Sequence, residues 1–314
     1  GPTLFNIFLN DLFFLINDAG VTIYNYADDN TLCYESNSVD DLLNTINRYG
    51  STMTNWFQSN GMKANPDKYQ TIIFGKQHAP GDVPNFSVSG ITIKSDKSVK
   101  LLGILLDDKL SFCHQAALIC RKAGRQINAM MRVSRMLDTD AKVKVYMSFI
   151  YSTFMYCPAV WLFCGKTHLN QLEKLNCRAL RFVYNDYVST YDALLLKGNH
   201  KSIHVIFMHT LAIEVYKCIN GISPQYMSTI FQREQHGYSI RSRVNLIQPS
   251  FRSIRYGYYT FSYLGAKVWN NLPNHVKESA SLQFFLSRWV FFFFQVNQSK
   301  GAEEKKENKQ KKKK

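Results

Sequence analysis

The spacing of apolar residues near the N-terminus predicts an amphipathic helix over residues 2–16. Within this range an apolar side chain recurs every four residues, which places the set on one face of a helix. The members of this stripe are Leu4, Phe8, Leu12 and Ile16.

Two short segments follow that are rich in Val, Ile, Tyr, Thr and Leu, at residues 21–26 and 30–35. Such composition is typical of β-strands, and Ala-Asp-Asp-Asn stands between them. The pattern predicts a β-hairpin that carries Asp28 and Asp29 at its tip. Adjacent carboxylates repel each other, so this position needs an explanation.

A second helix is predicted from the cap residue Ser38 to the stop residue Gly61. Residues 65–76 then form a turn that leads into a strand, residues 80–98 hold short β-like runs, and residues 100–108 are a buried strand. The predicted order α-ββ-α-β-ββ is that of an α+β domain with an antiparallel sheet.

From residue 114 the pattern becomes helical, and residues 114–137 place four arginines on one stripe. These are Arg121, Arg125, Arg132 and Arg135. Ile127, Met130, Val133 and Leu137 are predicted to face the opposite way. The stripe has two interpretations of equal weight, a solvated basic face and a surface that contacts phosphates.

Further helices are predicted at residues 141–157, 167–184 and 202–219. Residues 236–275 mix several Tyr with four arginines, a combination that suits either single-stranded nucleic acid or a Tyr-rich edge of the core. We favour the core edge slightly. The arginines are Arg241, Arg243, Arg252 and Arg255.

The composition favours a polyanionic partner. The net charge is +15, and a basic protein attracts nucleic acid first and anionic membranes second. Residues 300–314 hold eight Lys and three Glu, a local charge of +5, and the tail from residue 297 is predicted to be disordered. The most apolar run, residues 282–296, is interrupted by Arg288 and is too short to span a membrane. Seven Cys without paired spacing fit reduced thiols inside the cell.

The acidic pair has two interpretations. Asp-Asp-Asn is ordinary turn chemistry. Alternatively, a divalent cation neutralises the two carboxylates, because Mg²⁺ takes one or two carboxylates together with substrate phosphates, and two such ions serve nucleotidyl transfer.

The order of several segments along the chain favours the metal-binding interpretation of the acidic pair over the plain turn. "YADD" on a hairpin resembles the catalytic tip of reverse transcriptases. Residues 1–12, "GPTLFNIFLNDL", are similar to the end of the palm motif that begins Gln-Gly. Residues 56–76 resemble the next helix and strand, and residues 99–112, "VKLLGILLDDKLSF", resemble the hairpin that grips the primer. Residues 238–249 and 263–285 resemble the C-terminal region of jockey-like, non-LTR (LINE) retrotransposon polymerases.

This resemblance implies RNA-templated DNA synthesis from a DNA primer and deoxynucleoside triphosphates. It implies that Asp28 binds Mg²⁺, with Mn²⁺ as an alternative ion, and that Asp29 is a second, less direct carboxylate. Asn65 and Lys68 match the family's Asn-x-x-Lys; Lys68 approaches the leaving pyrophosphate in one interpretation and simply faces solvent in the other. The Arg stripe would hold the template–primer duplex.

The chain departs from the family pattern in one respect. The family has a further Asp on a strand before the Gln-Gly motif, and a fingers region, and this sequence starts after both. Asp11 and Asp18 do not match that pattern, so we expect a fragment that is inactive alone. A nuclear location is expected, no membrane partner is expected, and protein partners are unknown.

The expected domains are a partial palm, a helical thumb-like region, a C-terminal retroelement region and a Lys-rich tail. They cover residues 1–113, 114–235, 236–296 and 297–314. Two alternatives remain: a non-catalytic nucleic-acid-binding module, and a helical interaction protein whose acidic pair is only a turn.

Overall fold

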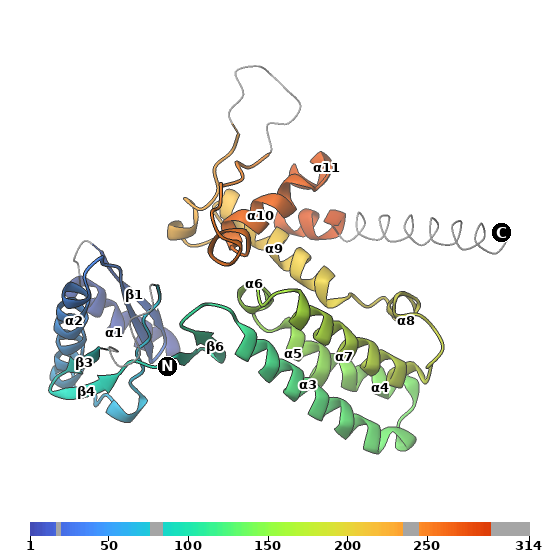
Figure 1. The fold of residues 1–314 in the computed structure, drawn as a ribbon, viewed down its shortest axis with the longest axis horizontal. Helices are drawn as coiled ribbons and strands as arrows, with labels where there is room; N and C mark the ends of the chain where they lie inside the picture. Colours follow the sequence, from blue (N-terminus) through green and yellow to red (C-terminus); the bar gives the residue numbers. More distant parts are fainter. Residues whose placement is uncertain (17–19, 76–83, 235–244, 290–314) are drawn as a thin grey trace. The chain divides into compact units, whose positions relative to one another are not determined.

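The computed structural model describes residues 1–16, 20–75, 84–234 and 245–289 (Figure 1). Its contacts divide the chain into two compact units, Gly1–Gln115 and Ala116–Lys314, and each is described by itself. The predicted disorder of the tail from residue 297 lies outside the described residues. The fold class is confirmed, with short antiparallel hairpins in the first unit and helices in the second.

The first unit begins with α1 (Pro2–Leu15), which confirms the predicted helix. It buries Leu9 and Leu12, but the predicted stripe is only partly right. Leu4 is 72% exposed and Phe8 is 43% exposed. The ring of Phe8 still lies 5.6 Å from that of Trp56, which joins α1 to the next helix.

Within its described residues, the strands of the unit form three separate two-stranded antiparallel sheets rather than one sheet. Each pair is a hairpin of sequential strands. The pairs are β1 (Val21–Tyr26) with β2 (Asp29–Tyr34), β3 (Asn85–Val88) with β4 (Ile91–Lys94), and β5 (Ser98–Leu101) with β6 (Ile104–Asp107).

The second helix, α2 (Val39–Ser59), starts as predicted. The Ser38 hydroxyl accepts a hydrogen bond from the N–H of Asp41, which satisfies one of the free donors at a helix start. The Asp41 carboxylate in turn accepts hydrogen bonds from Ser36 and Tyr34, and these lower its pKa.

One face of α2 covers the β3–β4 hairpin. Leu42, Leu43 and Ile46 pack against a buried cluster of Phe86, Val88 and Ile93. Gly50 permits this contact, because a Cβ at that position would lie 2.9 Å from a methyl group of Val88.

Two strand predictions are wrong. The segment after residue 65 forms a single bridge, Thr71 with Ser95, instead of a strand, because the neighbouring residues find no further ladder partner in the described part of the chain. Residues 100–108 are not one strand, since Leu102 and Gly103 turn the chain between β5 and β6. Both turn residues have positive φ, 45° and 84°, as a type I′ hairpin turn requires.

The second unit is helical, and the predicted helices at residues 114–137, 141–157, 167–184 and 202–219 are confirmed in outline. The bounds are α3 (Cys113–Val133), α4 (Thr139–Val145), η3 (Tyr146–Tyr151), α5 (Ser152–Met155), α6 (Pro158–Trp161), α7 (Lys166–Tyr184), α8 (Tyr191–Lys197), α9 (Ile203–Ile219), α10 (Phe261–Asn270) and α11 (Asn274–Lys277). In α3, Ile127 and Met130 are buried as predicted, whereas Val133 is exposed, because the chain changes there from α-helix to the short 3-10 helix η2 (Ser134–Met136).

A chain of hydrogen bonds, buried at Tyr146 and partly buried at Tyr191, joins η3, α7, α8 and α9. Tyr146 donates to Asn176 at 2.6 Å, Asn176 donates to Tyr191 at 2.7 Å, and Tyr191 donates to Glu173 at 2.6 Å. Glu173 also accepts from the first backbone N–H groups of α9, those of residues 203 and 204. Burial raises the pKa of both tyrosines, so they keep the protons that they donate.

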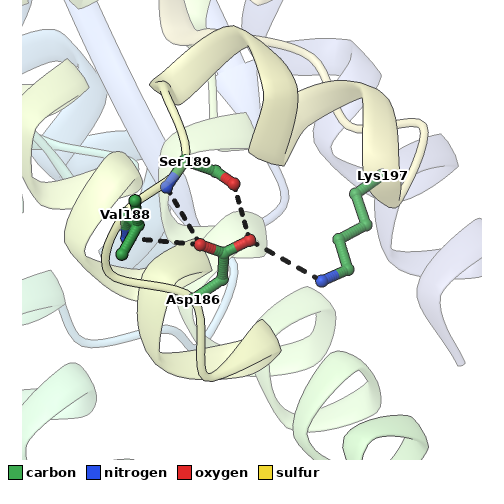
Figure 2. A network of polar contacts seen from close by, with 4 residues as sticks. All are labelled: Asp186, Val188, Ser189 and Lys197. Carbon is green, nitrogen blue, oxygen red and sulfur yellow. Dashed lines mark hydrogen bonds and ion pairs between the residues drawn. The ribbon is translucent and has the colours of Figure 1, made fainter.

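The link between α7 and α8 is organised by Asp186 (Figure 2). Its carboxylate accepts hydrogen bonds from the N–H groups of Val188 and Ser189 and from the Ser189 hydroxyl. These contacts with Ser189 hold the pKa of Asp186 below its usual value. Lys197 approaches the same carboxylate at 3.8 Å.

The C-terminal helices are joined by polar and aromatic contacts. The buried Lys277 donates to the Asn245 side chain at 2.8 Å and to the Asn270 carbonyl at 3.0 Å. Tyr263 lies in ring contact with Phe251 and Tyr258. This favours the interpretation of the Tyr-rich segment as an edge of the core. Arg252 is exposed, while Arg241, Arg243 and the side chain of Arg255 lie outside the described part.

We predict that Asn176→Ala destabilises the helical unit by about 2–4 kcal/mol, because it leaves the buried Tyr146 hydroxyl without its acceptor and removes the amide that donates to Tyr191. Chemical denaturation followed by circular dichroism measures the change. Asn170→Ala, an exposed position on the same helix, is the control and should change stability by less than about 0.5 kcal/mol. Equal effects of the two substitutions would contradict the importance of the network.

Candidate metal and nucleic-acid site

The β1–β2 register places the two acids at the hairpin tip. Tyr26 pairs with Asp29, so the turn consists of Ala27 and Asp28 alone. Ala27 has a φ of 54°, a conformation that costs an L-residue about 1–2 kcal/mol. Asp28 therefore lies in the turn itself, and Asp29 is the first residue of β2, one residue earlier than predicted.

Both carboxylates are open to solvent and uncompensated. Asp28 and Asp29 are exposed. Within the described ranges, neither side chain has a hydrogen-bond or ion-pair partner. The neighbouring Asn30 donates its amide to the backbone carbonyl of Asp28 at 3.1 Å, which fixes the turn and leaves the Asp28 carboxylate unengaged.

The two acids meet one requirement of a divalent cation site and leave another open. Their carboxylates lie on adjacent residues, no cationic side chain of the described ranges pairs with them, and one or two carboxylates are the protein ligands that Mg²⁺ usually takes. However, the described residues contain no cluster of three or more His, Cys, Asp or Glu side chains suited to a metal ion. Asp28 and Asp29 could thus supply two ligands, and others must come from elsewhere.

Aromatic side chains share the face of Asp29. Residues opposite each other in an antiparallel pair point to the same face, so Tyr26 lies beside Asp29, with Tyr24 two residues further along. Both tyrosines are exposed. Tyr24 and Tyr26 are two residues apart in a predicted strand, so the sequence already placed both rings on one face of it. The predicted site did not include these two tyrosines.

Lys68 ends a short 3-10 helix, η1 (Pro66–Lys68). The Asn65 side chain accepts the N–H of Asp67 at 3.1 Å, and Pro66 fits the first position of such a turn. This explains the local structure of the Asn-x-x-Lys segment. Lys68 is exposed, without an ion-pair partner in the described part of the chain.

The four predicted arginines are all exposed, but they do not form one uniform stripe. Arg121, Arg125 and Arg132 lie on α3, whereas Arg135 lies in η2. Among the four, Arg121 lines an open hollow of about 460 Å³. Helix α7 supplies the other charged side chains of this hollow, Lys174 and Arg178, which sequence reasoning missed although they lie four residues apart on a predicted helix.

The chain is similar in sequence to known reverse transcriptases. The family model of the reverse transcriptase (RNA-dependent DNA polymerase) matches residues 1–106. Over these residues the chain is similar to reverse transcriptases. The match covers α1 and the hairpins up to β6, and so includes Asp28, Asp29 and Lys68.

The curated relatives are reverse transcriptases of mobile elements. The chain is 26% identical over 189 residues to the RNA-directed DNA polymerase from mobile element jockey of Drosophila melanogaster, which covers 58% of this chain and 20% of that protein. It is 26% identical over 192 residues to the probable RNA-directed DNA polymerase from transposon BS of the same species, with 58% and 21% covered. The chain thus spans about a fifth of the length of these relatives. No solved structure matches significantly.

These findings confirm the prediction of a jockey-like, non-LTR retrotransposon reverse transcriptase. Reverse transcriptases as a family depend on a divalent metal ion and act on an RNA template, a primer and nucleotides. In the described residues, no helix is both long and apolar enough to cross a membrane.

In this reverse transcriptase segment, the hairpin that resembles the primer grip ends in a buried acid. Asp107 is 5% exposed. Its carboxylate accepts hydrogen bonds from the N–H groups of Lys109, Ser111 and Phe112 at 3.2, 2.9 and 2.8 Å. These bonds stabilise a turn in which Leu110 and Phe112 both have positive φ.

Hydrogen bonding decides the charge state of Asp107. Burial raises its pKa, but the hydrogen bonds from Ser111 and Phe112, with help from Lys109, outweigh burial and lower the pKa below its ordinary value. The carboxylate therefore stays ionised at neutral pH. A second bond, from the N–H of Leu105 to the Gln115 side chain at 2.9 Å, joins β6 to the start of α3.

We predict that Asp107→Asn destabilises the first unit by about 2 kcal/mol at pH 7, because an amide cannot replace the ionised acceptor of several N–H groups. The folded-state pKa lies below the unfolded value of about 3.9. The contribution of the carboxylate is thus complete above that value and is lost as the pH falls through the folded-state pKa. Denaturation at pH 7 and at pH 3 should therefore show a smaller gap between wild type and variant at pH 3.

The neighbouring acid provides the control. Asp108 is half-buried and accepts no side-chain hydrogen bond among the described residues, so Asp108→Asn should have little effect at either pH. A pH-independent loss in Asp107→Asn would show that the carboxylate charge is not what stabilises the turn.

Proposed function

We propose that this chain contributes part of the palm and a duplex-binding helical region to an RNA-directed DNA polymerase, with Asp28 as a ligand of Mg²⁺ or Mn²⁺. Asp29 is the second, less direct carboxylate. The observation that carries the proposal is the uncompensated acid pair on a strained two-residue turn, inside the segment that matches the reverse transcriptase family.

The geometry favours a ligand role over a plain turn. A turn that only reverses the chain gains nothing from two exposed acids, and like charges on adjacent positions are unfavourable. Asn30 already provides the hydrogen bond that stabilises the turn. The hairpin ladder holds Asp29 directly and limits the position of Asp28 in the adjoining two-residue turn, which suits the fixed geometry that a metal site needs.

The ion would lower the barrier of nucleotidyl transfer by stabilising the charge that develops on the reacting phosphate oxygens. The residues of this chain would hold the ion and orient the nucleotide. Asp28 and Asp29 offer oxygen ligands to the ion. The exposed rings of Tyr24 and Tyr26 offer aromatic surface to a nucleotide. Completion of the site requires a further carboxylate. Asp11 is exposed on α1 and we assign it no such role, while Asp18 lies outside the described residues.

The remaining roles follow from the same proposal. Lys68, an exposed cation without a partner in the described ranges, approaches the leaving pyrophosphate. Arg121, Arg125, Arg132 and Arg135 hold the phosphates of the template–primer duplex. We assign the palm to residues 1–113, the thumb-like region to residues 114–235 and the C-terminal retroelement region to residues 236–296. The nucleus is the proposed location.

A second candidate function is nucleic-acid binding without catalysis. The observation that favours it is the concentration of unpaired cations on α3 and α7, which binds phosphates whether or not the acid pair holds a metal ion. The two functions differ in their dependence on Asp28.

A hybrid enzyme tests the catalytic proposal. Residues 1–106 would replace the matching segment of the jockey polymerase, and extension of a DNA primer on an RNA template would be measured with Mg²⁺. Asp28→Asn should lower extension at least about 100-fold, as expected when a group that stabilises transition-state charge is lost. Asp29→Asn and Lys68→Ala should give smaller losses, of about tenfold.

Asp40→Asn is the matched control, because Asp40 is an exposed acid at the start of α2. It should leave extension unchanged. If the Asp28→Asn hybrid extends the primer as well as the unmodified hybrid, the metal assignment is wrong and the non-catalytic function is favoured.

A further inference from the structure

We propose that the hollow between α3 and α7 binds the sugar–phosphate backbone of one nucleic-acid strand, with Arg121, Lys174 and Arg178 as the phosphate contacts. This inference rests on the proposed function in one respect, that the chain binds nucleic acid. It adds two phosphate contacts on α7, Lys174 and Arg178, which form one wall of the hollow. Neither the arginine pattern of α3 nor the comparisons indicate these residues.

The hollow is a shallow depression, and the exposed surface of its wall is mostly apolar. It is open to solvent, has a volume of about 460 Å³ and is lined by six residues. Those residues are Cys120, Arg121, Gln171, Lys174, Leu175 and Arg178. Three are cations and none is acidic, while Cys120 and Leu175 offer apolar surface to a sugar ring.

Arg178 is held in position before any ligand binds. One of its terminal nitrogens donates to the Asn128 side chain at 2.9 Å and lies 3.5 Å from the sulfur of Met131. Both partners belong to α3, so this bond also joins the two walls of the hollow. A guanidinium has five N–H donors, and those that Asn128 does not use stay available to phosphate oxygens.

The three cations lack acidic partners. In the described part of the chain, none of Arg121, Lys174 and Arg178 forms an ion pair. The acid nearest in sequence, Glu173, points its carboxylate to Tyr191 and to the N-terminus of α9. The positive charge of the hollow is thus not cancelled locally, which favours an anionic ligand.

The spacing on α7 fits several consecutive phosphates. Gln171, Lys174 and Arg178 are separated by three and four residues, so they lie on one face of the helix. Seven residues of α-helix span about 10 Å, which is the axial length of about three nucleotides. A cationic groove of this kind binds the backbone without reading sequence.

The salt dependence of binding tests the proposal. The full chain would be titrated onto a labelled RNA–DNA duplex at several NaCl concentrations. The variant Arg121→Gln/Lys174→Gln/Arg178→Gln should bind about tenfold more weakly per lost cation near 0.1 M salt. Its slope of log K against log salt should become shallower by between about 2 and 3, because each phosphate contact contributes about 0.9.

A charge-matched variant separates the hollow from net charge. Lys122→Gln/Lys144→Gln/Lys166→Gln removes three exposed cations from the same helical unit, and its slope should change by less than about 1. Circular dichroism and thermal unfolding of both variants check that they are folded. Equal slopes for the two triple variants would overturn the proposal.

A double variant isolates the new wall. Lys174→Gln/Arg178→Gln should lower the slope by about 2; an unchanged slope would overturn the assignment on α7. Wild-type chain that does not bind the duplex at low salt would overturn this inference and nucleic-acid binding together. The two proposals can also be told apart. If duplex binding is lost in the hollow variants but the hybrid polymerase is unaffected by Asp28→Asn, this inference stands and the catalytic proposal fails.

Discussion

Two adjacent carboxylates, Asp28 in a two-residue turn and Asp29 at the start of β2, repel each other, and no side chain of the described residues pairs with either. The ladder of β1 and β2 fixes the register up to Tyr26 and Asp29, so the acids cannot separate by slipping along the strands. No cation approaches them within the described ranges. Water solvates these exposed carboxylates, and the divalent ion that we propose would offset their charge directly.

The first unit contains another Asp-Asp dipeptide, near its C-terminal end, in which one carboxylate is satisfied by hydrogen bonds. Asp107 and Asp108 also form an Asp-Asp pair after a strand, yet Asp107 is buried and accepts three backbone N–H groups. There the acid is structural, because the turn supplies the positive ends of peptide dipoles. The contrast between an acid satisfied by the backbone and an acid left open is a better indicator of a ligand than the dipeptide itself.

The sequence predicted the elements that depend on local chemistry and missed those that depend on partners. Ser38 caps α2 as predicted, and the helices predicted at residues 167–184 and 202–219 start within one residue of α7 and α9. The strand expected near Thr71 failed because a strand exists only with a ladder partner. The turn at Leu102 and Gly103 was missed by the pattern of apolar residues, which predicted one strand over residues 100–108, although Gly103 is a turn signal and the resemblance of residues 99–112 to a hairpin implied a turn. The acid pair was found from sequence, whereas the exposure of its side chains and the α7 wall needed coordinates.

The basic character of the chain acquires a more specific meaning from the structure. A net charge of +15 by itself predicts only general attraction to polyanions, and such attraction is screened beyond about 10 Å in 0.1 M salt. Attraction between a cationic side chain and a phosphate persists in salt only where the two groups are close together and the side chain is held in a suitable orientation. Arg178 meets both conditions, because Asn128 fixes its guanidinium and the hollow lets a phosphate approach it. The proposed contacts on the helical unit therefore depend on local geometry rather than on total charge.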